Sequence, residues 1–418
     1  MSYDLILRNC RLLRSPDVTE TADVALSGKK IAAIAPRIEA PGETEYDVGG
    51  NLVSPPFVES HIHLDSALTA GEPRPNESGT LFEGISIWEE RKKSLTVEDV
   101  KKRAIATLKL QAQQGILFVR THADVSESNL IALRGLLEVR EAVKDWMTLQ
   151  VVAFPQDGIY SRPENELLLE KAIEMGADVV GGIPHYEFTR EDGVKSVHRT
   201  FELAEKYDRL IDIHCDEIDD EQSRFLEVVV ACAVRSGLGA RVTASHTTAF
   251  ASYPNAYALK LMGLLGRSRI NFIANPLINI TLQGRTDTYP KRRGITRVKE
   301  LWKNGSNVSF GHDCIRDPWY GLGTGNMLDV AHMAVHVCQM TGLSEIDACY
   351  DMVTGNGAKT LSVENDYGIE VGKTANLIVL NVGNRYEAIR MRSPVRQVFS
   401  RGKLLAETKP VQSIFYDG

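Results

Sequence analysis

The stretch ILFVRTH, residues 116–122, belongs to a series of short apolar segments that recur along the middle of the chain. Similar segments begin 29 to 37 residues apart, at Met147, Val179, Leu210, Arg241, Ile270 and Asn307. Such an interval accommodates one strand, one helix and two loops, and near-continuous apolar strands are typical of a parallel sheet buried on both faces. The run NLVSPPFVESHIH from Asn51 supplies an eighth strand. The pattern predicts an α/β fold, a (β/α)₈ or TIM barrel.

One segment shows how the helices between these strands are encoded. It begins at Thr96 with Thr-Val-Glu-Asp, a helix-capping pattern, and ends at Gly115. Val100, Ala104 and Leu108 are spaced four apart and share one face, as a helix that packs on a barrel requires.

The two ends of the chain differ from the middle. DLILRNCRLL and ADVALSGKKIAAIA near the start, and ANLIVLNV and VRQVFSRGKLLAE near the end, are apolar runs separated by glycines and polar turns, which is typical of strands. We predict a small β-sandwich formed by residues 1–56 and 365–418, beside a barrel formed by residues 57–364. Two separate β subdomains are the alternative, but each would have too few strands to be stable alone.

Composition excludes several classes of protein. The 418 residues suit one large barrel with an accessory unit, and 43% hydrophobic with 25% charged residues is typical of a soluble enzyme. The net charge of -7 argues against a nucleic-acid partner. The longest apolar run, residues 228–234, is far shorter than the ~20 residues of a membrane span. With no signal peptide and no CxxC spacing among six cysteines, we expect a cytoplasmic enzyme without a membrane partner.

Candidate metal ligands stand at the ends of the predicted strands, where barrel enzymes gather their functional residues. They are His61, His63, His214, His246 and Asp313. His61 and His63 are two apart, so both point to one side of an extended chain. Three imidazoles and one carboxylate leave a position for water, as in catalytic metal sites. No lysine follows the fourth strand, where His185 stands, which favours one ion rather than two.

Glu217 is a candidate proton shuttle, because it lies three residues beyond His214 in HCDEIDDEQSR. A solvated acidic loop is the alternative interpretation, since four other acidic residues surround it. The position beside a ligand-bearing strand favours a catalytic role. His312 directly precedes Asp313 and is expected to lie behind it or in the core.

These residues stand in motifs that resemble the bacterial cytosine deaminases of the amidohydrolase superfamily. The resemblance runs from about residue 51 to residue 372. It includes SPPFVESHIHLD, SGTLFEGI, VVAFPQ, GGIPHYEFTRE, RLIDIHCDEIDDEQSR, ASHTT, QGRTDTYPKRRGITRVKE and FGHD. The HxH pattern alone is shared by the whole superfamily, whereas HCDEIDDEQSR and TDTYPKRRGITRVKE are much narrower signals.

The resemblance implies one divalent ion per subunit, Fe(II) or Zn(II), with His61, His63, His214 and Asp313 as its ligands. Hydroxide would attack C4 of a free pyrimidine base and Asp313 would take its proton. Glu217 would protonate ring nitrogen N3, and His246 would orient the water. Cytosine would thus give uracil and ammonia. The resemblance also implies a homo-oligomer.

The same resemblance assigns the contacts of the base. Gln156 would bond its amide-like edge, Phe154 and Trp319 would flank its ring, and Leu81 would line the pocket. A planar, polar base needs such an amide partner and apolar faces. Other amino-substituted rings remain alternatives: isocytosine, a triazine or a purine such as isoguanine. A non-catalytic scaffold is the least favoured alternative, because such chains usually lose ligands.

Cys314 is the one departure from the family pattern in this region. Family members commonly have a second Asp directly after the metal-binding Asp, whereas this chain reads Gly-His-Asp-Cys. A thiol tolerates contact with carbon better than a carboxylate, which needs hydration. We therefore predict that 5-methylcytosine is deaminated to thymine at least as well as cytosine to uracil. A neutral exchange or a reactive thiol is the alternative.

Overall fold

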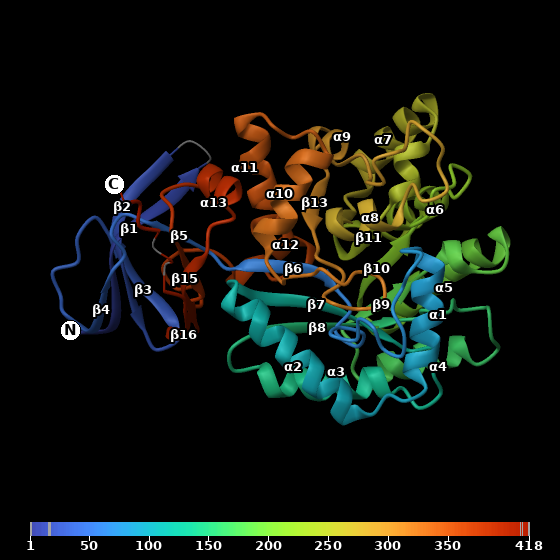
Figure 1. Ribbon diagram of the computed structural model, residues 1–418, viewed down its shortest axis with the longest axis horizontal. Helices are drawn as coiled ribbons and strands as arrows, with labels where there is room; N and C mark the ends of the chain where they lie inside the picture. Colours follow the sequence, from blue (N-terminus) through green and yellow to red (C-terminus); the bar gives the residue numbers. More distant parts are fainter. Residues whose placement is uncertain (1, 16–17, 410, 412, 417–418) are drawn as a thin grey trace.

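The computed structural model describes residues 2–15, 18–409, 411 and 413–416. A barrel with its surrounding helices lies beside a sheet that is built from strands near both ends of the chain (Figure 1). Within these described residues, no helix combines the length and the apolar character that crossing a bilayer requires.

Eight parallel strands of the described chain form the barrel, and each pairs with its neighbour in sequence. The strands are β6 (Phe57–Ile62), β7 (Ile116–Asp124), β8 (Thr148–Phe154), β9 (Val179–Gly182), β10 (Leu210–Cys215), β11 (Val242–His246), β12 (Asn271–Ala274) and β13 (Asn307–Phe310). From β7 onward, every strand begins within one residue of its predicted start. The predicted (β/α)₈ barrel is confirmed.

The barrel closes through the residues that follow its last strand. Ile62 bridges to Asp313, the His63 N–H donates to the Asp313 carbonyl at 2.9 Å, and the Asp313 N–H donates to the His61 carbonyl at 2.8 Å. The backbone contact that completes the ring therefore also fixes the relative positions of three candidate ligands.

The helices and short 3₁₀ turns follow the strands in alternation. They are α1 (Leu81–Lys92), α2 (Val97–Gln113), α3 (Ile131–Val143), α4 (Asn165–Glu174), η1 (Pro184–Tyr186), α5 (Arg190–Tyr207), α6 (Phe225–Ser236), η2 (Gly239–Arg241), η3 (Thr248–Ser252), α7 (Asn255–Ser268), α8 (Pro276–Leu282), α9 (Val298–Lys303), α10 (Met327–Val337), α11 (Leu343–Met352), α12 (Gly355–Thr360), η4 (Glu364–Asp366) and α13 (Arg385–Met391). Helix α2 is the one predicted from Thr96 to Gly115. Thr96 caps it by accepting from the Asp99 N–H at 3.1 Å.

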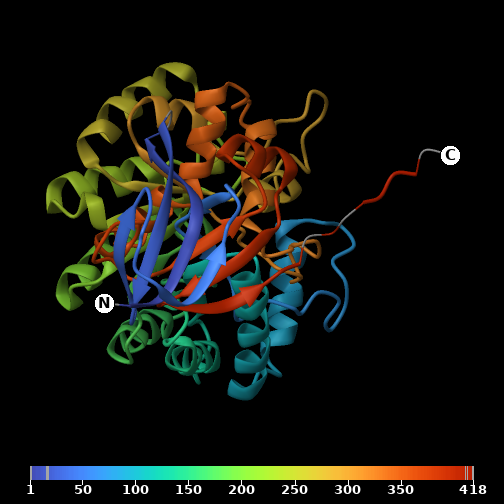
Figure 2. The ribbon, with the colours of Figure 1, turned by 90° about the vertical axis from the view of Figure 1, so that its left-hand side faces the viewer.

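The remaining strands form a single sheet that combines both ends of the chain. They are β1 (Tyr3–Ser15), β2 (Val18–Ser27), β3 (Lys30–Ala35), β4 (Gly42–Asp47), β5 (Leu52–Ser54), β14 (Leu377–Leu380), β15 (Val395–Ser400) and β16 (Lys403–Glu407). Strand β5 from the first part pairs antiparallel with β14 from the last part, so early and late strands lie side by side (Figure 2). The prediction that both termini combine in one β unit is confirmed, and the described strands of this unit form a single sheet rather than two facing sheets. The domain boundaries at residues 56 and 365 stay a prediction.

The apolar run from Asn51 serves both units instead of forming one strand. Its first part is β5 in the terminal sheet and its second part is β6 in the barrel. Pro55 and Pro56 separate the two parts, because proline has no N–H to donate and interrupts a strand ladder. The end of the terminal sheet is thereby tied directly to the first strand of the barrel.

A buried ion pair crosses the interior of the barrel. Arg120 on β7 and Asp212 on β10 are both fully buried, with Nη1 and Oδ2 3.0 Å apart. Arg120 also donates to Thr243 Oγ1 at 3.2 Å and to the Thr360 carbonyl at 2.9 Å. The guanidinium therefore joins strands β7, β10 and β11 to the end of α12.

Replacing Arg120 by Met should lower the free energy of unfolding by about 3–5 kcal/mol, because Asp212 is left as an uncompensated buried charge. Urea unfolding followed by tryptophan fluorescence measures the loss. The double variant Arg120→Met/Asp212→Asn removes both charges and should recover part of it. A single variant within about 1 kcal/mol of the parent would contradict the prediction, given the usual cost of breaking a buried pair.

Candidate active site

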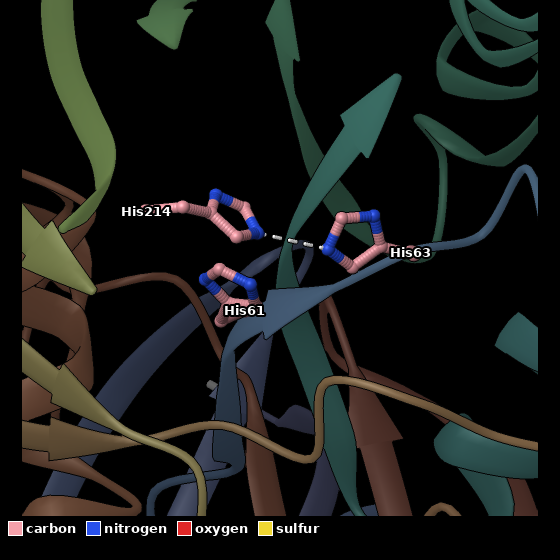
Figure 3. A group of neighbouring side chains, drawn as sticks. All are labelled: His61, His63 and His214. Carbon is pink, nitrogen blue, oxygen red and sulfur yellow. Dashed lines mark hydrogen bonds between the residues drawn. The ribbon is translucent and has the colours of Figure 1, made fainter. Parts of the chain in front are cut away.

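The four predicted ligands converge at the carboxyl end of the barrel. His61 lies on β6, His63 directly after it, and His214 on β10; Asp313 follows β13 by three residues. Asp313 Oδ1 lies 3.3 Å from His61 Nε2 and 3.4 Å from His63 Nε2. The Nε2 atoms of His63 and His214 lie 3.2 Å apart, joined by the dashed line in Figure 3. All four side chains are buried.

This cluster fits a divalent cation. Ligand atoms that surround an ion tetrahedrally at ~2.0–2.1 Å are about 3.3–3.4 Å from one another, which matches the separations here. Burial, and next the neighbouring imidazoles, hold the pKa values of His61, His63 and His214 well below the usual value, so these rings are neutral and offer lone pairs. Among the described residues, His61 Nε2 has no hydrogen-bond partner. Such an unsatisfied buried nitrogen is what a cation would satisfy.

A hydrogen bond to Nδ1 sets the tautomer of His61. Ser245 Oγ lies 3.2 Å from His61 Nδ1 and donates to Asp212 Oδ1 at 2.5 Å. Because the hydroxyl proton goes to the carboxylate, the hydroxyl oxygen accepts from Nδ1–H of His61. The Nε2 lone pair is therefore left free on the side of the cluster. The ion pair of Asp212 with Arg120 is thus linked to a ligand.

Glu217 and His246 form a second, adjoining group. Glu217 Oε1 lies 3.1 Å from His246 Nδ1, and burial raises the pKa of Glu217 to about 8. Asn279 Nδ2 lies 3.0 Å from the same nitrogen and can donate to it, which leaves the imidazole proton on Nε2. Burial lowers the pKa of His246 to about 3. The pair thus offers a carboxylic acid that keeps its proton at neutral pH, beside a neutral imidazole.

A cavity opens beside these groups and brings together most of the predicted base contacts. Gln156, Leu81, Trp319 and Cys314 line it, together with Glu217 and the ligands His63, His214 and Asp313. Phe154 lies farther back, where its ring stacks on His214 with centroids 4.0 Å apart. Its contact is therefore with a ligand ring. His312, buried behind Asp313 as expected, accepts from the Thr324 and Gly325 N–H groups.

Cys314 lies in an apolar corner of the cavity, and its thiol also interacts with the buried Asp317 carboxylate. It forms a buried cluster with Ile278 and Leu282 of α8, and Leu81 and Trp319 pack against this cluster. Burial, and then the nearby acidic residues, raise the pKa of the thiol well above its usual value, so the group is neutral. A small apolar substituent on a ring in this cavity would find carbon and sulfur here.

Sequence reasoning missed two histidines of the site. His122 lies two residues before the end of β7, and its ring centroid lies 4.0 Å from that of His61 and 5.0 Å from that of His63. The signal was available, because His122 is the last letter of ILFVRTH and stands near a strand end like the predicted ligands. His185 lines the cavity. From the sequence, His185 was predicted only to occupy the place of a bridging lysine, without a role in the cavity.

The fold and the site define a (β/α)₈-barrel protein whose catalytic end is suited to one divalent cation. A model of the amidohydrolase family matches residues 44–406. N-isopropylammelide isopropyl amidohydrolase of Pseudomonas sp. (strain ADP) is 31% identical, over 98% of each chain. The chain belongs to the amidohydrolase family.

Solved structures give a closer likeness. The chain is 48% identical to the 5-methylcytosine deaminase of Klebsiella pneumoniae, seen with phosphonocytosine and with 5-fluorocytosine. The TM-scores are 0.94 and 0.95, over 98% of this chain and 100% and 99% of those chains. These structures share the arrangement of the barrel and the terminal sheet along nearly the whole length.

Replacing His61, His63, His214 or Asp313 by Ala should reduce bound metal at least tenfold, because each change removes a ligand atom from the cluster. His246→Ala should keep most of the metal while turnover collapses. Elemental analysis of the purified variants measures the metal, with His198→Ala on the exposed face of α5 as control. Equal metal loss in His246→Ala would make His246 an ordinary ligand and contradict the assignment.

Proposed function

We propose that this protein is a metal-dependent hydrolytic deaminase of free cytosine-type bases, acting on both cytosine and 5-methylcytosine. The observation that carries the proposal is the position of Glu217, which lies buried in the same cavity as His63, His214 and Asp313 and contacts His246. Hydrolysis of a cyclic amidine needs these two functions side by side: a source of hydroxide and an acid for the ring nitrogen. Membership of the amidohydrolase family and the likeness to 5-methylcytosine deaminase support it.

The chain's own residues divide the proton transfers between them. A divalent cation held by the cluster would lower the pKa of a water molecule toward ~7 and so supply hydroxide for attack at C4. Asp313 accepts the proton that this water loses. Glu217 donates its proton to N3, which draws electrons away from C4. His246, with a ring nitrogen within 4.8 Å of ligand atoms of His61 and Asp313, orients the attacking water. The proton held by Asp313 then passes to the amino group, which leaves as ammonia when its bond to C4 breaks, and the C4 hydroxyl returns its proton to Glu217 as the C4 carbonyl forms.

Recognition of the base rests on one amide and two apolar walls. Gln156 is only 7% exposed and lines the cavity, where its amide can form hydrogen bonds with the N1–H and C2=O edge of a free base. Trp319 and Leu81 supply flat and apolar contacts. Leaving the buried Gln156 amide without a hydrogen-bond partner costs about 1–3 kcal/mol. The amide therefore discriminates against rings that lack the N1–H and C2=O edge.

Several finer features stay predictions. The cation is expected to be iron or zinc, the assembly a homo-oligomer, and the location the cytoplasm. The scaffold alternative is set aside, because the family is one of hydrolases and the complete ligand set is present. Isocytosine, triazines and purines remain in the test as competing substrates.

Ammonia release from cytosine, 5-methylcytosine, isocytosine, isoguanine and an aminotriazine tests the proposal. We expect turnover of the first two and much slower turnover of the rest, with uracil and thymine identified as products. Glu217→Gln should abolish turnover while bound metal is unchanged, because the amide cannot deliver the proton to N3. A preference for any of the other three rings, or near-normal turnover in Glu217→Gln, would overturn the proposal.

Cys314→Asp should shift the preference from 5-methylcytosine toward cytosine. The carboxylate would replace the thiol in the apolar corner formed with Ile278 and Leu282, where it loses hydration against a methyl group. One methyl in a fitted pocket is worth roughly 10–200-fold in kcat/KM, and the ratio of the two kcat/KM values should move within that range. Cys338→Ser, at the end of α10, serves as the matched control. An unmoved ratio shows that Cys314 does not set the preference.

A further inference from the structure

A buried ammonium group lies at the last residue of α1, outside the cluster of ligands. The Lys92 side chain is only 3% exposed, and its Nζ lies 3.1 Å from Asp157 Oδ2, 3.3 Å from Asp124 Oδ2 and 3.6 Å from Glu127 Oε1. Burial alone lowers the pKa of Lys92, but the three carboxylates together raise it above its usual value, so the group stays charged. Lysine is rarely buried unless paired.

The carboxylates that hold Lys92 are attached to the strand ends that carry the site. Asp157 directly follows Gln156, and Asp124 is the last residue of β7. The Asp157 N–H donates to Ser126 Oγ at 3.0 Å, and the Ser126 N–H donates to Asp124 Oδ1 at 2.8 Å. Together with the two ion pairs of Lys92, these bonds form a closed ring that includes the backbone N–H of Asp157, the residue directly after Gln156.

Helix α1 is fastened by the same network and forms a wall of the cavity. Leu81 at its start lines the cavity. Gly84 lies directly against the Trp319 ring, where a Cβ would collide with the indole. Trp88 donates from Nε1 to Asp124 Oδ2 at 3.1 Å. The helix that bears Lys92 thus contacts one ring wall of the pocket and is anchored to the strand ends beneath it.

A role in stability alone is a poor account of this arrangement. Removing the Lys92 ammonium and the buried carboxylates of Asp124 and Asp157 from water costs about as much free energy as their mutual attraction returns. A buried ion cluster therefore contributes little to the stability of a fold. Such a cluster fixes geometry instead. Charge-assisted hydrogen bonds lock the rotamers of its side chains, and these hold the positions of neighbouring groups to within a fraction of an ångström. The group beside Asp157 that needs such precision is the amide of Gln156.

We propose that Lys92 is a positioning residue for base recognition: through Asp157 it holds Gln156 against the edge of the substrate, and through α1 it holds the wall that Leu81 provides. This inference rests on the proposed function. Because Lys92 touches none of the four ligands, its loss affects binding of the base rather than the cation.

A double-variant cycle on the metal-loaded enzyme tests the inference with cytosine and 5-methylcytosine. Lys92→Met should raise KM at least tenfold, with kcat within about threefold of the parent and bound metal unchanged. In the Gln156→Ala background the same change should have an effect at least fivefold smaller, because both variants remove the same contact. Lys93→Met, which changes the exposed residue next to Lys92, should leave both KM and kcat unchanged.

Asp157→Asn provides a second arm that keeps the shape of the side chain and the charge of Lys92. It should reproduce the rise in KM and its loss in the Gln156→Ala background, and it carries the test if Lys92→Met does not fold. Three outcomes would each overturn the inference. They are KM increases of the two single variants that multiply fully in the double variant, a fall in kcat without a rise in KM, and loss of bound metal. If the parent deaminates neither base, the proposed function is wrong and the inference fails with it. A parent that deaminates cytosine and gives a multiplicative cycle overturns the inference alone.

Discussion

The ion pair of Arg120 and Asp212 is the constraint on which the site depends. Both of its side chains are fully buried inside the barrel, and its carboxylate accepts the hydroxyl proton of Ser245. That single proton decides which nitrogen of His61 is free for a cation. The charges of Arg120 and Asp212 neutralise each other inside the barrel. The positions of the candidate ligands at its carboxyl end are therefore set by hydrogen bonds that solvent does not reach.

Burial has opposite effects on the two kinds of titratable group at the rim. It lowers the pKa values of the imidazoles, which therefore offer lone pairs, and it raises the pKa of Glu217, which therefore keeps a proton. Both results follow from the same loss of hydration, since a low dielectric disfavours the charged form of each group. One water-poor environment thus prepares a cation site and an acid within a few ångströms of each other.

The barrel and the cluster of candidate ligands at its carboxyl end were predictable because each is encoded locally. Strands buried on both faces appear as continuous apolar runs, and ligands stand at their ends. The run from Asn51 was interpreted as one barrel strand, although the predicted boundary after residue 56 divides it where Pro55 and Pro56 separate β5 from β6. The corner around Cys314 and the surroundings of Lys92 could not be predicted, since they join α8 to a loop after β13, and α1 to the ends of β7 and β8. Such contacts between distant segments leave no periodic trace in the sequence.

The pairing of β5 with β14 has a consequence for synthesis on the ribosome. Strands β1 to β5 emerge first, but the strand that covers their open edge lies at Leu377–Leu380, near the end of the chain. The unpaired N–H and C=O groups of β5 are thus exposed while the whole barrel is being translated, and exposed edges of this kind invite pairing with other chains.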